Sequence, residues 1–93
     1  METALWYMLA GARGGPNRIR IVRALRERPR NANQLAEDLG LDYTTIRYHL
    51  DVLMDHDVVR NSGGGYGTVY LLTDRIERNW TTVESVIDTL EDA

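Results

Sequence analysis

Five polar side chains recur at helical spacing in residues 43–51 and could bind a nucleic acid. They are Tyr43, Thr44, Arg47, Tyr48 and Asp51. On a helix they share one side, opposite the apolar Ile46, Leu50 and Leu53. An arginine can donate two hydrogen bonds to guanine, a threonine can touch the thymine methyl group, and tyrosines can reach bases or phosphates. We therefore expect an exposed DNA-contacting face here, rather than the ordinary polar outside of an amphipathic helix.

Capping patterns predict the two short helices that position this face. Asn31 and Gln34 form a capping-box pattern at the start of a helix that ends at Gly40. Two residues later, Asp42 can cap a second helix that runs to about residue 55. Two short helices joined by a glycine-containing turn form a helix-turn-helix, here over residues 31–55.

A β-hairpin is predicted over residues 58–72. Residues 58–60 form one strand, residues 62–67 a glycine-rich turn and residues 68–72 the returning strand. A hairpin turn is favoured over a phosphate-binding loop, because no helix start and no Lys-Ser/Thr pair follow the glycines.

Further helices are predicted on both sides of this unit. A helix over residues 16–28 begins with Pro16 in its first turn and stops before Pro29. An apolar helix over residues 2–10 precedes it. A last helix begins at Asp74, with Glu77 three residues on, and runs to about residue 91.

The two terminal helices carry more apolar surface than the central unit needs. The last helix repeats apolar side chains at spacings of four, three, four and three, a heptad pattern. Packing against the chain's own core is one explanation. We favour a dimer interface built from residues 1–12 and 74–93. Its predicted members are Leu5, Trp6, Leu9, Ile76, Trp80, Val83, Ile87 and Leu90.

Positive charge is concentrated near the start of the chain, although the net charge is −3. Residues 13–30 hold seven arginines against one glutamate. This imbalance predicts a confined polyanion-binding face, in which Arg18, Arg20 or Arg23 contacts phosphates. The alternative is a helix face that is merely solvated.

Composition excludes several other classes of function. The chain has no cysteine, so it forms neither disulfides nor thiolate metal sites. No apolar run approaches the length of a membrane span, and the N-terminal segment holds Glu2 without a basic region, unlike a signal peptide. We expect a cytoplasmic protein that does not associate with membranes.

Neither the histidines nor the carboxylates predict a catalytic or metal site. His49 and His56 are seven residues apart, which does not suit a metal pair. His49 lies beside the apolar stripe and is expected to be partly buried and hydrogen-bonded, and His56 to lie in the turn before the hairpin. Since no nucleophile and base are paired, we expect no enzymatic activity, no cofactor and no bound metal.

Residues 16–73 resemble the ArsR-type winged-helix regulators. The matching stretches are PNRIRIVRAL from Pro16, QLAEDLG from Gln34, TTIRYHL from Thr44, Leu53, and VYLLT from Val69. The resemblance implies a dimer whose recognition helices enter successive major grooves. By position, it assigns the base and phosphate contacts to Tyr43, Thr44, Arg47 and Tyr48.

The chain departs from this family in two respects. Metal sensors of the family use cysteines in the recognition helix or carboxylate and histidine clusters in the last helix, and this chain has no cysteine and no histidine there. We therefore expect no metal sensing. The hairpin tip lacks a basic residue, so its DNA contacts are limited to Arg60 at the base and Tyr66 with backbone amides at the tip.

These observations predict one α+β, mainly helical domain over residues 1–93. It is a winged helix-turn-helix with a two-stranded wing and additional N- and C-terminal dimerisation helices. The expected function is a dimeric repressor that binds specific sequences in double-stranded DNA. An alternative is a protein-interaction or assembly module without specific DNA binding. A small-molecule effector pocket at the dimer interface is compatible with DNA binding and stays open.

Overall fold

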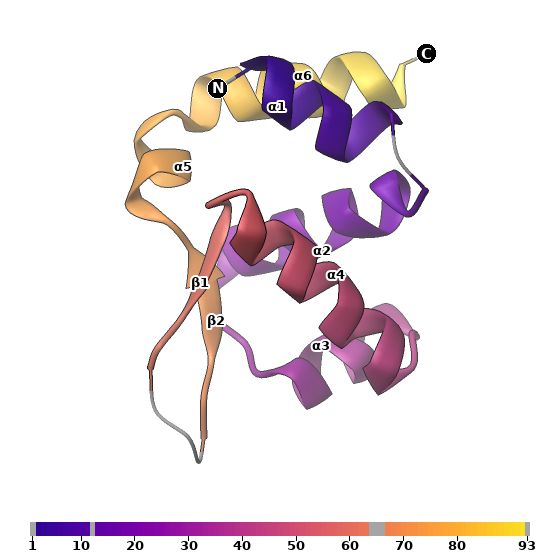
Figure 1. Cartoon of the computed structure of the whole chain (residues 1–93), viewed down its shortest axis with the longest axis vertical. Helices are drawn as coiled ribbons and strands as arrows, with labels where there is room; N and C mark the ends of the chain where they lie inside the picture. Colours follow the sequence, from indigo (N-terminus) through magenta and orange to yellow (C-terminus); the bar gives the residue numbers. More distant parts are fainter. Residues whose placement is uncertain (1, 12, 64–66, 93) are drawn as a thin grey trace.

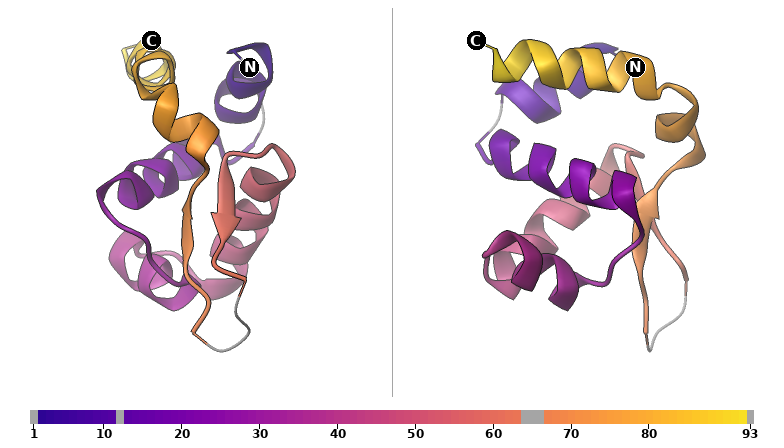
Figure 2. Two further views of the ribbon diagram at one scale, coloured as in Figure 1. Left: turned by 90° about the vertical axis from the view of Figure 1, so that its left-hand side faces the viewer. Right: turned by 180° about the vertical axis from the view of Figure 1, so that it is seen from behind.

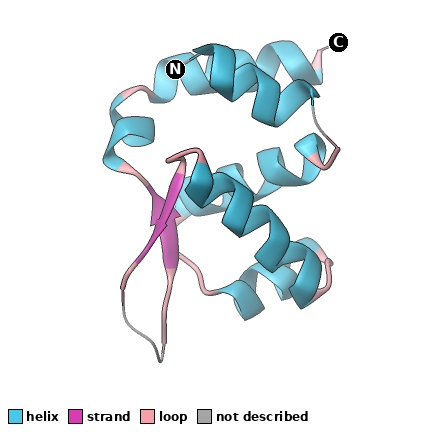
Figure 3. Cartoon of the chain, in the orientation of Figure 1, coloured by secondary structure: helices cyan, strands magenta, loops and turns pink. Residues whose placement is uncertain are grey.

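The computed structural model describes residues 2–11, 13–63 and 67–92. Its elements, in chain order, are α1 (Glu2–Trp6), the π-helix η1 (Tyr7–Gly11), α2 (Gly15–Glu27), α3 (Ala32–Leu39), α4 (Tyr43–Asp55), β1 (Val59–Asn61), β2 (Tyr70–Leu72), α5 (Asp74–Arg78) and α6 (Trp80–Glu91) (Figure 1). Helices dominate, and the two strands form one antiparallel sheet (Figure 3), as a winged helix requires. No helix in these ranges is long and apolar enough to cross a membrane.

The elements form three levels. At one end α1 packs beside α6, α2 crosses the middle, and α3 with α4 lies beyond it, with the hairpin along one side (Figure 2). Side chains from every level meet in one continuous core. It includes Ile21 and Val22 of α2, Leu35 of α3 and Leu50 of α4. The α3–α4 pair therefore lies at the opposite end of the molecule from α1 and α6 (Figure 1).

The helix-turn-helix forms through the predicted caps. Asn31 Oδ1 accepts a 2.7 Å hydrogen bond from the Gln34 amide, and Gln34 Oε1 accepts one of 2.9 Å from the Asn31 amide. Gly40 ends α3 in the left-handed conformation, with φ at 68°. The structure confirms the predicted start and end of this helix, since both caps depend only on residues nearby in the sequence.

In the hairpin β1 keeps the predicted length but is shifted by one residue, β2 is shorter than predicted, and there is one additional partner. Val59 pairs with Leu72, and Asn61 with Tyr70. On the other edge of β2, the amide of Tyr70 donates to the carbonyl of Arg30 at 2.8 Å and its carbonyl accepts from the Arg30 amide at 3.2 Å. Tyr70 is thus fixed between β1 and the segment that leads into α3.

The predicted last helix is two helices, which corrects the prediction of one. Thr73, not Asp74, caps α5, because its Oγ1 accepts from the Ile76 amide while it donates to the Asp57 carbonyl. Asn79 ends α5, and its Nδ2 donates to the Arg75 carbonyl at 2.8 Å. This backbone break turns α6 so that it lies against α1.

Candidate nucleic-acid interface

The predicted recognition helix is α4, and its N-terminus is fixed by Asp42. One carboxylate oxygen of Asp42 accepts a 3.1 Å hydrogen bond from the Thr45 amide, and the other accepts one of 2.6 Å from the Thr45 hydroxyl. Both hydrogen bonds lower the pKa of Asp42 from its ordinary value of 3.8, and the one from the Thr45 hydroxyl has the larger effect. Ile46 and Leu50 are fully buried beneath the helix. The opposite face is therefore held toward solvent.

The four predicted contact residues of α4 all reach this solvent face. Tyr43 is 47% exposed and Tyr48 is 59% exposed, and Thr44 is exposed as well. The Arg47 side chain is 42% exposed. Its Nη1 lies 3.5 Å from the Tyr43 hydroxyl, and its Nη2 lies 3.7 Å from an Asp51 carboxylate oxygen. The hydrogen bond to Tyr43 is the largest cause that raises the pKa of Arg47.

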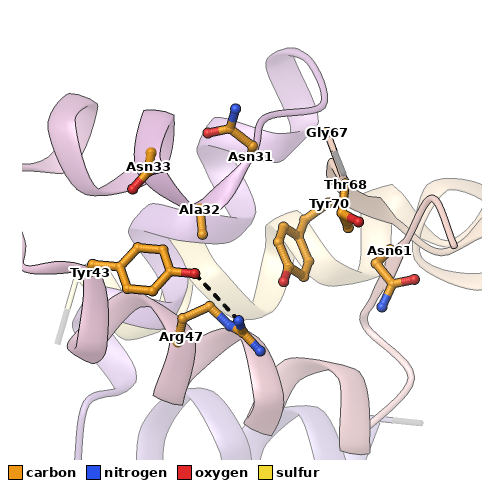
Figure 4. A pocket seen from close by; sticks show the side chains of 9 residues that line it. All are labelled: Asn31, Ala32, Asn33, Tyr43, Arg47, Asn61, Gly67, Thr68 and Tyr70. Carbon is orange, nitrogen blue, oxygen red and sulfur yellow. Dashed lines mark hydrogen bonds between the residues drawn. The ribbon is translucent and has the colours of Figure 1, made fainter. Parts of the chain in front are cut away.

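A polar pocket of about 390 Å³ lies between α3, α4 and the hairpin (Figure 4). Among the described residues, those that line it are Asn31, Ala32, Asn33, Tyr43, Arg47, Asn61, Gly67, Thr68 and Tyr70. Sequence reasoning found Tyr43 and Arg47 but missed the others. The Asn31 cap was a usable indication, because a predicted helix start next to the recognition helix places free backbone amides there.

The hairpin carries a further predicted contact residue, Arg60. Arg60 in β1 is exposed, and its guanidinium has no partner among the described residues. The amide of Gly63 donates to Asn61 Oδ1 at 3.0 Å, and the amide of Val69 donates to Ser62 Oγ at 3.2 Å. Tyr66, the predicted contact at the tip, lies outside the described residues.

The prediction that Arg18 faces DNA is wrong. Its side chain points into the molecule, and the residue is only 2% exposed. Nη1 donates a 2.9 Å hydrogen bond to the Met8 carbonyl, and the guanidinium carbon lies 6.0 Å from the centre of the Tyr48 ring. The helical periodicity of residues 16–28 placed Arg18 outside, but packing of η1 on α2 covers that side.

Most of the other arginines in residues 13–30 bind groups of the chain itself. Arg20 donates to the Leu39 carbonyl at 2.6 Å. Arg23 pairs with Glu91 and lies 3.7 Å from Asp88 of α6, and Arg26 pairs with Glu77 of α5. The buried Arg30 pairs with Asp38 at 3.0 Å. Most arginines of this segment thus bind carboxylates or carbonyls of the chain itself, contrary to the expected basic face.

The predicted dimer interface needs correction as well. Five of its eight members are buried within the single chain, namely Leu5, Leu9, Ile76, Val83 and Ile87. They have almost no surface left for a second copy. The buried side chains of the heptad stripe, which spans α5 and α6, join the chain's own core. In the ribbon, α6 lies beside α1 (Figure 2). Trp6, Trp80 and Leu90 are only partly buried.

The histidines have structural surroundings. His49 is buried, as expected, but its Nδ1 has no hydrogen-bond partner in the described part of the chain. Burial, and then the charge of Arg18, lowers the pKa of His49 below 6.5. His56 ends α4, and its Nδ1 lies 2.9 Å from the Val52 carbonyl. Over residues 2–11, 13–63 and 67–92, no three potential metal ligands gather.

Comparisons with known proteins agree with this geometry. A crystal structure of Rv0081 from M. tuberculosis is similar, with a TM-score of 0.74 and 26% sequence identity over 98% of this chain and 89% of that chain. No curated protein sequence matches the chain. The family model described as "Bacterial regulatory protein, arsR family" matches residues 15–61, from the start of α2 to the end of β1. The chain therefore belongs to the ArsR family of bacterial regulatory proteins, which makes it a DNA-binding transcription regulator.

Proposed function

We propose that this regulator binds specific duplex DNA sequences through α4 and represses transcription as a homodimer. The observation that carries the proposal is the exposed face of α4, with Tyr43, Thr44, Arg47 and Tyr48 beside the N-terminus of α3 and the hairpin. Two tyrosines, a threonine and an arginine on one exposed helix face suit contacts to bases and phosphates.

The shape of this face fits the major groove. That groove admits one α-helix, and the first turns of a recognition helix contact base edges. Tyr43 and Thr44 occupy the first turn of α4, and Tyr48 follows one turn later. Their hydroxyls can donate and accept hydrogen bonds, and the Thr44 methyl group can contact thymine. Arg60 on the hairpin would add a phosphate contact.

The homodimer accounts for how one short helix could select a site in a genome. Two recognition helices related by a two-fold axis contact half-sites about one helical turn apart. Since most side chains of the heptad stripe are buried within one chain, the two copies would meet through the surface of α1, η1 and α6 that is still exposed. That surface includes Tyr7, which is 67% exposed, and the partly buried Trp6, Trp80 and Leu90.

Selection of bound fragments from genomic DNA tests specificity. We expect recovered fragments to share two half-sites, and sedimentation at micromolar concentrations to show two protein chains on each duplex. Fragments without a common sequence would contradict specific binding. A monomer that binds its selected site tightly would contradict the dimer.

A reporter gene placed behind the selected site tests repression. Its expression should fall when the protein is present, and a rise would contradict repression.

The alternative of a protein-interaction module gains some support from the internal pairing of Arg23, Arg26 and Arg30. The two functions differ in their response to salt. Binding to random duplex DNA weakens steeply with salt when phosphates are neutralised, because counterions are released. We expect that dependence here. Absence of any random-duplex binding at low salt would favour the protein-interaction module.

A further inference from the structure

The pocket between α3, α4 and the hairpin has the donors of an anion site. Among the described residues that line it, Arg47 alone carries a charge and none is a carboxylate. Ala32 and Asn33 stand in the first turn of α3, where backbone amides have no partner within the helix. Such amides attract anions, because the helix dipole is positive at this end.

The hydroxyl of Tyr70 points into this pocket (Figure 4). Tyr70 is only 6% exposed, and pairing with Arg30 and Asn61 on both sides fixes its backbone. Within the described ranges, its hydroxyl has no hydrogen-bond partner. The residue is buried while its hydroxyl opens onto the pocket, so this oxygen is free to donate to a bound group. A ligand in the pocket would supply a partner.

Arg47 is oriented by neighbours that hold it at the edge of this pocket. Its Nη1 lies 3.5 Å from the Tyr43 hydroxyl, and Figure 4 shows the guanidinium on the same side as the Tyr70 hydroxyl. Asp51 lies 3.7 Å from Nη2 and offsets part of the charge. The remaining donors of Arg47 and the Tyr70 hydroxyl can therefore bind one group together.

We propose that this pocket binds a phosphate group of the DNA backbone. Arg47 and the Tyr70 hydroxyl donate hydrogen bonds to it, together with the first-turn amides of Ala32 and Asn33. This assigns Arg47 to fixing the register of α4 on DNA, in place of the guanine contact that its type and spacing predicted. Base selection is left to Tyr43, Thr44 and Tyr48. The inference rests on the proposed DNA binding and specifies one of its contacts.

Two variants and one modified duplex test the assignment. Tyr70→Phe removes a single oxygen and keeps the buried ring, and Arg47→Gln removes the charge at a partly exposed position. We expect each variant to lose as much affinity for random duplexes as for the selected duplex. For Arg47→Gln the loss should be about tenfold. The salt slope of Arg47→Gln should become shallower by about one unit. A loss confined to the selected duplex would overturn the proposal, because it would indicate a base contact.

A neutral methylphosphonate, placed at one linkage at a time along the half-site, locates the phosphate with the unaltered protein. One position should weaken wild-type binding about tenfold. The same position should have little further effect on Tyr70→Phe or Arg47→Gln, since the contact is already lost. If every position weakens the variants as much as the wild type, the pocket does not hold a phosphate.

Titration with inorganic phosphate separates this proposal from the DNA function. We expect the NMR signals of the Ala32 and Asn33 amides to shift in the wild type, and to shift much less in Arg47→Gln. If those shifts occur but the protein binds no duplex, the pocket binds anions. The proposal that the anion is a DNA phosphate, and the proposed DNA-binding function, would then both be refuted. Tight duplex binding that is unaffected by Tyr70→Phe, without amide shifts, would refute the pocket and leave the function standing.

Discussion

Arg18 Nη1 donates a 2.9 Å hydrogen bond to the backbone carbonyl of Met8, which joins the π-helix η1 to α2. Both residues are buried. The same guanidinium lies 6.0 Å from the ring centre of Tyr48, on the exposed face of α4. One buried arginine thus connects the N-terminal helical segment with the helix that we propose to contact DNA.

Arg18→Ala should therefore destabilise the fold by about 1–3 kcal/mol, because it leaves the buried Met8 carbonyl without its donor. Amide hydrogen exchange in residues 7–11 should accelerate by more than elsewhere. Urea unfolding and exchange measured by NMR provide the test. Arg28→Ala is the matched control, because Arg28 is exposed and its guanidinium has no partner among the described residues; it should stay within about 0.5 kcal/mol of wild type. Equal stabilities for the two variants would show that the bond to Met8 is not important.

Loss of the α3 cap should be measurable. Asn31→Ala removes the acceptor of the Gln34 amide, and we expect a cost of about 0.5–2 kcal/mol in the free energy of unfolding. Asn33→Ala is the control, since Asn33 is exposed in the same first turn and its side chain has no hydrogen bond in the described structure. It should change stability by no more than about 0.5 kcal/mol. If the control destabilises as much as Asn31→Ala, the capping box is not the cause.

Gly14→Ala should be more harmful than Gly40→Ala. Both glycines have positive φ, 86° and 68°, and alanine there costs about 1–2 kcal/mol. A Cβ on Gly14 would also clash with Cε1 of the buried His49, whereas one on Gly40 meets open space. Thermal and urea unfolding of both variants measure the difference. In a His49→Ala background, Gly14→Ala should cost about as much as Gly40→Ala. Equal costs in the wild-type background would refute the packing of Gly14 on His49.

Stability should depend on pH through His49. Burial, and then Arg18, lowers its pKa in the folded chain below the ordinary 6.5. The unfolded chain therefore binds this proton more readily, so the stabilising contribution is complete above about pH 6.5 and is lost as pH falls through the folded-state pKa. The difference in unfolding free energy between wild type and His49→Phe should shrink or reverse as pH falls from about 7.5 to 5. A difference that is independent of pH would contradict this.

The sequence predicted the elements whose causes are local. Three local features form as expected, namely the caps Asn31 and Asp42 and the left-handed Gly40. Each makes its hydrogen bonds to residues only a few positions away. The break at Asn79 was missed, because it depends on a side-chain bond to Arg75 and on where α6 finds an apolar partner. A heptad stripe shows that a helix is covered on one side, but it does not show whether the cover is a second copy or α1.

The candidate site divides in the same way. Exposure of Tyr43, Arg47 and Tyr48 followed from helical periodicity, since the buried stripe of α4 determines the opposite face. The partners of Arg18 and Arg30 could not be predicted, because a charge count does not show which arginines will pair with carboxylates or be covered by another helix. Tyr70 is placed in the site by the pairing of β2 with β1 and with Arg30, and the second of these is a contact between segments far apart in the chain.

The most direct test of the central claim is fluorescence anisotropy with a duplex from the fragment selection and a scrambled duplex of equal length, at several salt concentrations. We predict that the selected duplex binds at least about 10³-fold more tightly than the scrambled one. Both affinities should fall as salt rises. Substituting Tyr43 and Tyr48 together by alanine should remove most of the preference while the circular dichroism spectrum is retained. Equal affinities for the two duplexes, or a preference that survives the double substitution, would contradict DNA recognition by α4.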